Sequence, residues 1–78
     1  MSASESLQLA DQTAQGLKAG TWESVEALAV LAMAHGTGPA AQALVAQARA
    51  AADSCKAGTW PAVRALAWLA QAEDALAG

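Results

Sequence analysis

The stretch Lys18–Ala34, "KAGTWESVEALAVLAMA", recurs 38 residues later as Lys56–Ala72, "KAGTWPAVRALAWLAQA". The two segments align without a gap and share their first five residues and seven of the twelve that follow. Self-similarity at a period of this length is typical of helical-hairpin repeats. We therefore predict two tandem αα-hairpins, residues 3–35 and 39–76, related by a pseudo-twofold axis and forming a four-helix bundle.

The composition favours helices throughout. Alanine supplies 24 of the 78 residues, valine occurs four times, and isoleucine, phenylalanine and tyrosine are absent. Alanine has the highest intrinsic helix propensity, whereas strands are enriched in the β-branched and aromatic residues that are scarce here. The fold class predicted from the composition is all-α.

Capping residues and helix breakers place the helix boundaries. Ser2 and Glu5 have the spacing of a capping box, which predicts a helix start at residue 3. Gly20 is expected at the C′ position of that helix, and Thr21 is expected to cap the next one. We predict helices over 3–18, 22–35 and 39–56, and a fourth that has Pro61 in its first turn and frays near Gly78.

Length and charge narrow the function classes. A chain of 78 residues forms one small domain, so we treat 1–78 as a single unit. A net charge of −3 with four basic residues argues against nucleic acid as a partner. The longest apolar run, Ala27–Ala34, is too short to cross a membrane. The N-terminal residues do not have the pattern of a signal peptide, so we expect a cytoplasmic protein.

The single cysteine and the single histidine receive structural interpretations. Cys55 cannot form an internal disulfide, and it stands where the first hairpin has Leu17, so we expect a small buried side chain. His35 precedes Gly36 and is expected to cap the negative end of a helix. No cluster of histidine, cysteine and acidic residues suggests a metal site, no cofactor is implied, and no base lies near a nucleophile. We therefore predict that the protein is not an enzyme.

Apolar stripes indicate which helix faces form the core. On the second predicted helix the stripe consists of Trp22, Val25, Leu28 or Ala29, and Ala32, and on the fourth it consists of Trp60, Val63, Leu66 or Ala67, and Ala70. Beyond these stripes, Ala27–Ala34 and Ala65–Ala70 have no polar residue at all. A helix that is apolar on every side is normally buried on every side, and a bundle of four short helices cannot surround all of them.

The apolar faces that the bundle cannot bury indicate the function. We expect a protein–protein interaction or assembly module that associates with itself, most simply as a homodimer, or with another protein, through helices two and four. The candidate surface consists of Trp22, Trp60, Trp68, Val30, Leu31, Met33 and Leu69. Trp22 and Trp60 have two open interpretations: each clamps its own hairpin, or both form a joint binding surface at one end of the bundle. Trp68 is either a core residue or an interface anchor.

The sequence also predicts an ion pair and allows an alternative function. Glu26 and Arg64 occupy equivalent positions with opposite charges, so we expect them to face each other and to specify which hairpins pair. As an alternative to the assembly module, the protein binds a small apolar ligand between its helices, in a cavity lined by Trp68, Met33 and Leu31.

Overall fold

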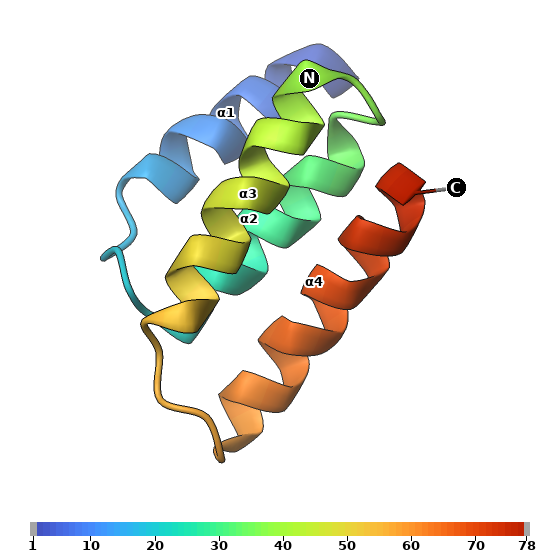
Figure 1. The fold of residues 1–78 in the computed structure, drawn as a ribbon. Helices are drawn as coiled ribbons and strands as arrows, with labels where there is room; N and C mark the ends of the chain where they lie inside the picture. Colours follow the sequence, from blue (N-terminus) through green and yellow to red (C-terminus); the bar gives the residue numbers. More distant parts are fainter. Residues whose placement is uncertain (1, 78) are drawn as a thin grey trace.

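The computed structural model describes residues 2–77 and contains helices alone as regular elements in that range. The four helices are α1 (Ala3–Gln15), α2 (Trp22–Ala34), α3 (Pro39–Asp53) and α4 (Trp60–Ala77). They pack as an elongated bundle in which α1 and α4 lie on opposite sides (Figure 1). The predicted all-α, four-helix architecture is confirmed. The predicted fraying at Gly78 lies outside the described residues.

Each predicted helix start is present, and side chains cap three of the four. The hydroxyl of Ser2 accepts a hydrogen bond from the backbone N–H of Glu5 at 3.2 Å. Thr21 accepts from the N–H of Ser24 at 3.2 Å, and Thr59 accepts from the N–H of Ala62 at 3.3 Å. The caps stabilise these starts because the first N–H groups of a helix lack partners within the helix. Helix α3 begins instead with Pro39, which has no N–H to satisfy.

The ends of α1 and α3 lie three residues earlier than predicted. Gly16 and Leu17 bond back by three residues, to Thr13 and Ala14, and Ser54 and Cys55 do the same 38 residues later, to Ala51 and Ala52. Such bonds tighten and close a final helical turn. Glycine has a low helix propensity, and Ser54 Oγ binds the carbonyl of Ala51 at 2.9 Å, so both sequences favour an end here.

Each inter-helix turn contains one glycine with a positive φ angle. Gly20, Gly36 and Gly58 have φ values of 78°, 88° and 99°. Residues with a side chain rarely adopt this left-handed conformation. Gly20 was predicted as the residue directly after α1, but α1 ends at Gln15, so Gly20 instead turns the chain into the Thr21 cap.

Helix α2 is the centre of the molecule. It packs extensively against both α3 and α4, whereas α1 contacts α2 alone among the helices described. The core cluster joins Val25, Ala29 and Ala32 of α2 to small residues of α3 and α4, among them Ala48 and Leu69. Alanines at these positions allow the helix backbones to approach closely.

This arrangement corrects the predicted symmetry. A twofold axis that exchanged the hairpins would give α1 the same contact with α4 that α2 has with α3. No such contact between α1 and α4 occurs within residues 2–77, so the predicted pseudo-twofold axis is wrong. In both hairpins the two helices touch over a short length only, and α2 occupies the space between α3 and α4.

The central position of α2 explains most of the apolar run Ala27–Ala34. Three helices pack against α2 and bury Ala29, Leu31 and Ala32, whereas Val30 stays 41% exposed. The same explanation does not extend to α4, which lies at the edge of the bundle (Figure 1). Within the described residues, no helix is long and apolar enough to span a membrane.

Candidate interaction surface

The two "KAGTW" turns lie against each other at one end of the bundle. The indole Nε1 of Trp22 donates a hydrogen bond to the carbonyl of Lys56 at 2.9 Å. In the reverse direction, Cys55 Sγ lies 3.1 Å from the carbonyl of Gly20 and donates to it. Both side chains are half-buried and pack against the core. Trp22 is therefore a clamp, but it joins the first hairpin to the second and does not close its own turn.

Trp60 occupies a different environment from Trp22. Its side chain is 74% exposed, the highest value among the large hydrophobic residues described. Val63, one helical turn further along α4, is 58% exposed, and Leu66 is 37% exposed. These side chains form the apolar face of α4 that sequence periodicity assigned to the core.

This exposed face is a continuous row on the outer side of α4. We call it the α4 stripe; it consists of Trp60, Val63, Leu66, Ala67 and Ala70, all of them exposed. The residues of α4 that enter the core lie on another face and are Ala62, Ala65, Leu69 and Ala72. The equivalent row on α2, which we call the α2 stripe, consists of Trp22, Val25, Leu28, Ala29 and Ala32, and all of it packs in or against the core. The prediction that both rows face the core holds for α2 and is wrong for α4.

The other candidate residues divide between core and surface. Leu69 and Leu31 are buried, at 1% and 7% exposure, so neither contributes a free surface. Trp68 and Met33 are half-buried against the core cluster. Val30 is exposed and lies on the side of α2 that α1 leaves partly open. Of the seven predicted surface residues, Trp60 and Val30 are the exposed ones.

An ion pair joins α2 to α4 next to this surface. Arg64 Nε lies 3.0 Å from both carboxylate oxygens of Glu26, so the two equivalent positions with opposite charges do face each other. The pair borders a depression that Glu23, Ala27 and Val30 also line. The Arg64 side chain is 61% exposed, and an ion pair this open to solvent contributes about 0–1 kcal/mol to stability.

Two further polar contacts, which the sequence reasoning missed, each hold one hairpin together. Asp11 of α1 binds Nε2 of His35 at 3.1 Å, and Arg49 of α3 binds Glu73 of α4 at 3.0 Å. The partners are separated by 24 residues in both cases. The second contact is the first one shifted by 38 residues, with acid and base exchanged. His35 is thus the C-cap residue at the end of α2, where its backbone N–H bonds to the carbonyl of Leu31, and its side chain contacts Asp11 of α1.

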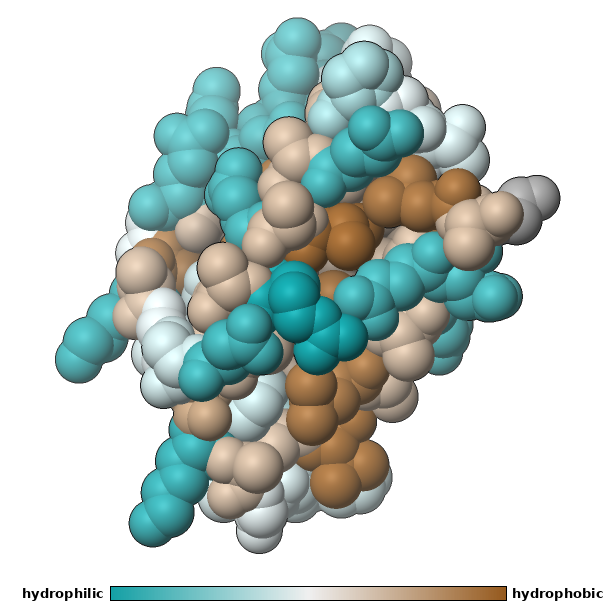
Figure 2. Space-filling view, viewed as in Figure 1, coloured by the Kyte–Doolittle hydropathy of each residue, from teal (hydrophilic) through white to brown (hydrophobic). Residues whose placement is uncertain are grey.

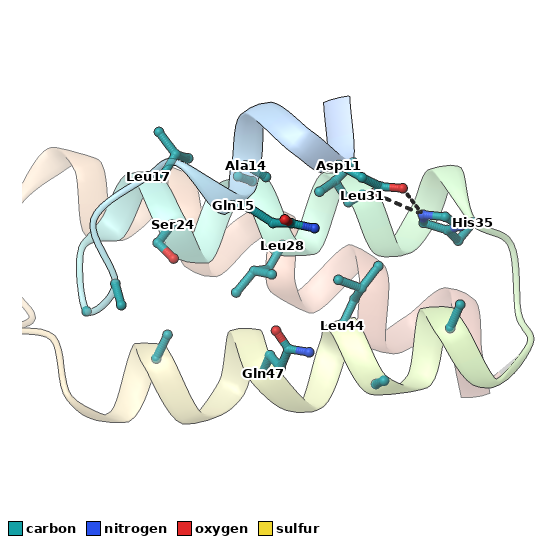
Figure 3. A pocket seen from close by; sticks show the side chains of 16 residues that line it. Asp11, Ala14, Gln15, Leu17, Ser24, Leu28, Leu31, His35, Leu44 and Gln47 are labelled. Atoms are coloured by element: carbon teal, nitrogen blue, oxygen red, sulfur yellow. Dashed lines mark hydrogen bonds and ion pairs between the residues drawn. The ribbon is translucent and has the colours of Figure 1, made fainter. Parts of the chain in front are cut away.

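Two grooves flank the thinly packed helix α1. The first lies between α1 and α3, has a volume of about 610 Å³, and has the Asp11–His35 contact at one end (Figure 3). Gln15 and Gln47 project into it from opposite walls. The second, which we call the α1–α2 groove, lies between α1 and α2 and has a volume of about 460 Å³. It is lined by Ser6, Leu9, Ala10, Thr13, Ala14, Leu17, Ala27, Val30 and Leu31.

The second hairpin also leaves apolar side chains at the surface. On the face shown in Figure 2, hydrophobic side chains are visible in the seam between α3 and α4, where these two helices diverge. Polar side chains cross this seam near its middle. The apolar surface of the molecule is therefore concentrated around α4 and in the grooves beside α1.

Comparisons with known proteins add no family to this description. No family model, no characterised protein and no solved structure matched the chain. Among residues 2–77, no three histidine, cysteine or acidic side chains lie close enough together to hold a metal ion.

Proposed function

We propose that this protein is a non-enzymatic assembly module that associates with further copies of itself through an apolar helix face. The observation that carries the proposal is the α4 stripe, in which Trp60, Val63 and Leu66 are 74%, 58% and 37% exposed. Contiguous apolar patches of this kind mark interaction sites, and tryptophan is enriched among the residues that dominate binding energy.

Two features favour another copy of the chain as the partner. The stripe has a tryptophan, a valine, a leucine and two alanines in the same order as the α2 stripe, which this chain already packs against its own α3 and α4. The rim of the stripe carries both a cation and an anion, Arg64 and Glu26, and does not have a single sign of charge. A mixed rim suits a surface that must meet a copy of its own chain.

Light scattering after size-exclusion chromatography tests the proposal. The protein should show a mass that rises with concentration above the monomer value of 7.8 kDa. Val63→Arg should shift the profile back to the monomer, because a buried unpaired charge is costly. The matched control is Ala46→Arg, which adds the same charge to an exposed position of α3 and should leave the mass of the wild type unchanged. A monomer at every concentration would exclude self-association.

The groove between α1 and α3 favours a second candidate function, the binding of a small apolar ligand. Leu28, Leu31 and Leu44 supply its apolar surface (Figure 3). Of the three residues predicted to line such a cavity, Leu31 does so, whereas Trp68 and Met33 pack against the core. A fluorescent apolar probe should bind with a stoichiometry of one, and Ala43→Trp, which fills the groove, should abolish that binding. An unchanged titration with this variant would exclude the groove as the site.

The cytoplasm remains the compartment in this proposal, because Cys55 acts as a free thiol that donates to Gly20 and a reducing environment preserves it.

A further inference from the structure

The inference concerns how two copies meet, and it rests on the self-association proposed above. Within one copy, one apolar stripe already packs against the other hairpin. The α2 stripe lies on a surface of the second hairpin that we call the docking face. This face consists of the residues of the second hairpin in the core cluster: Leu44, Val45, Ala48, Ala51, Ala52, Cys55, Ala65, Trp68, Leu69 and Ala72.

The first hairpin carries a counterpart of the docking face. Subtracting 38 from each docking-face residue gives Ser6, Leu7, Ala10, Thr13, Ala14, Leu17, Ala27, Val30, Leu31 and Ala34. Eight of these ten, all but Leu7 and Ala34, line the α1–α2 groove, and Leu9 is the ninth residue there. On the second hairpin this surface is covered by α2, whereas on the first hairpin Leu17 and Val30 are each 41% exposed. The groove is thus an open copy of a surface that the same chain fills elsewhere.

The α4 stripe is the counterpart of the helix face that fills it. Adding 38 to each residue of the α2 stripe gives the five residues of the α4 stripe. Val25 is fully buried in its docked position, and its counterpart Val63 is 58% exposed. The chain therefore presents one docked pair of complementary surfaces and, separately, an undocked copy of each member.

We propose that the α4 stripe of one copy docks in the α1–α2 groove of the next, reproducing between copies the contact that α2 makes with the second hairpin. The groove and the stripe lie on different parts of the molecule, so the contact is head-to-tail. A contact of this type leaves a free stripe at one end and a free groove at the other. Further copies therefore bind until the two ends join into a ring or no free copies remain.

The charges fit this arrangement. In the docked pair within the chain, Glu26 of α2 faces Arg64 of α4. Between copies, Arg64 takes the position of Glu26, and Glu26 of the next copy takes the position of Arg64. Opposite charges again meet, and the ion pairs form a row along successive α2 and α4 helices.

The two "KAGTW" turns fit it as well. Trp22 donates to the carbonyl of Lys56 within the chain. The corresponding contact between copies takes the exposed indole of Trp60 to the carbonyl of Lys18 in the next copy. This covers the second tryptophan and gives its indole N–H an acceptor, whereas in the monomer its side chain is 74% exposed.

The groove is less apolar than the docking face, which sets the strength of the association. Ser6 and Thr13 stand where the docking face has Leu44 and Ala51. The contact between copies therefore buries less apolar area than the contact within the chain, and it also has to offset the lost freedom of a second molecule. We expect a reversible, concentration-dependent chain of copies.

Two variants test the inference, and each of them disables one of the two surfaces. Val63→Arg disables the stripe and leaves the groove intact, and Ala10→Arg disables the groove and leaves the stripe intact. Both positions are exposed in the monomer, so circular dichroism should report an unchanged helix content. Each variant alone should be monomeric in light scattering at concentrations where the wild type and the Ala46→Arg control associate.

The decisive sample is the mixture of the two variants. Only the intact stripe of Ala10→Arg and the intact groove of Val63→Arg remain, so an equimolar mixture should form a dimer of twice the 7.8 kDa monomer mass and grow no further. Reversing the charge at Arg64 in the variant with the intact stripe should weaken that dimer, and reversing Glu26 in its partner should restore it.

Other outcomes overturn the inference in distinguishable ways. If Ala10→Arg alone still self-associates and Val63→Arg does not, α4 stripes pair with each other and the contact is not head-to-tail. If both variants associate like the wild type, neither surface is involved, and if the mixture stays monomeric the two surfaces do not meet. A monomeric wild type would instead contradict the proposed function itself.

Discussion

The two copies of "KAGTW" have the same local structure and opposite surroundings. In both, a glycine with positive φ precedes a threonine that caps the following helix, and a tryptophan begins that helix. The first tryptophan, Trp22, packs against the core and donates a hydrogen bond to the other turn, whereas Trp60 is 74% exposed. Identical residues thus specify the turn, and the helices that pack beside each turn determine whether its tryptophan is covered.

The reason for the difference is what packs against each helix. The second hairpin packs against the α2 stripe, whereas the α4 stripe is exposed. The predicted core face of α4 is therefore left at the surface, and α4 turns its alanine-rich face with Ala62, Ala65 and Leu69 inward.

The largest difference between the copies should appear when each tryptophan is removed. Trp22→Ala should lower the free energy of unfolding by about 3 kcal/mol, because it deletes packed aromatic surface and leaves the Lys56 carbonyl without its donor. Trp60→Ala should change it by less than about 0.5 kcal/mol in the dilute monomer. Urea denaturation at low protein concentration gives both values. Equal losses would show that Trp60 is also a clamp.

The two equivalent valines provide a second, smaller contrast. Val25→Ala should cost about 2 kcal/mol, from the lost apolar burial and the cavity left behind. Val63→Ala should leave the monomer almost unchanged, because Val63 is 58% exposed. Thermal and urea unfolding of the two variants check this. A destabilised Val63→Ala monomer would place the α4 stripe in a core and contradict the description of α4.

Substitution of the glycine in either "KAGTW" turn should have the same effect on stability. Gly20→Ala and Gly58→Ala should each lower stability by about 1–2 kcal/mol, since both residues hold a left-handed conformation that a β-carbon disfavours. No atom within 4 Å would contact a β-carbon added at Gly58, so the cost there is conformational and not steric. Losses that differ by more than the error of urea denaturation would indicate that the two turns are not locally equivalent.

The smallest effect is expected at the ion pair between α2 and α4. Glu26→Gln and Arg64→Gln should each cost below about 1 kcal/mol, and a double-mutant cycle should give a coupling energy in the same range that falls as salt is added. A coupling above this range would mean that the pair stabilises the fold and does not merely orient its parts.

The accuracy of the sequence predictions follows the range of the interactions involved. Helix starts were predicted correctly because Ser2, Thr21 and Thr59 act on N–H groups a few residues away. The predicted ends of α1 and α3 are too late, because Gly16 and Ser54 end these helices ahead of Gly20 and Gly58.

The candidate surface depended on information that periodicity does not contain. The repeat predicts that the same face points inward on α2 and on α4. Which face of α4 is buried depends instead on the helices that pack against it. The contacts Asp11–His35 and Arg49–Glu73 had a readable signal, because both pairs have complementary polar ends and the same 24-residue spacing. Searching the two hairpins for charges that change together would have found them.

Within one copy, Trp22 packs against the core and donates to the other turn, and we propose that Trp60 makes the equivalent contact between copies. The indole N–H resonances of the two tryptophans distinguish these environments. In ¹⁵N-correlated NMR spectra recorded from dilute to concentrated samples, the Trp22 Nε1–H signal should stay fixed and protected from solvent exchange. The Trp60 signal should shift and become protected as concentration rises, and Ala10→Arg should abolish that change. A Trp60 indole that stays unshifted and freely exchanging in samples where light scattering shows association would contradict the account.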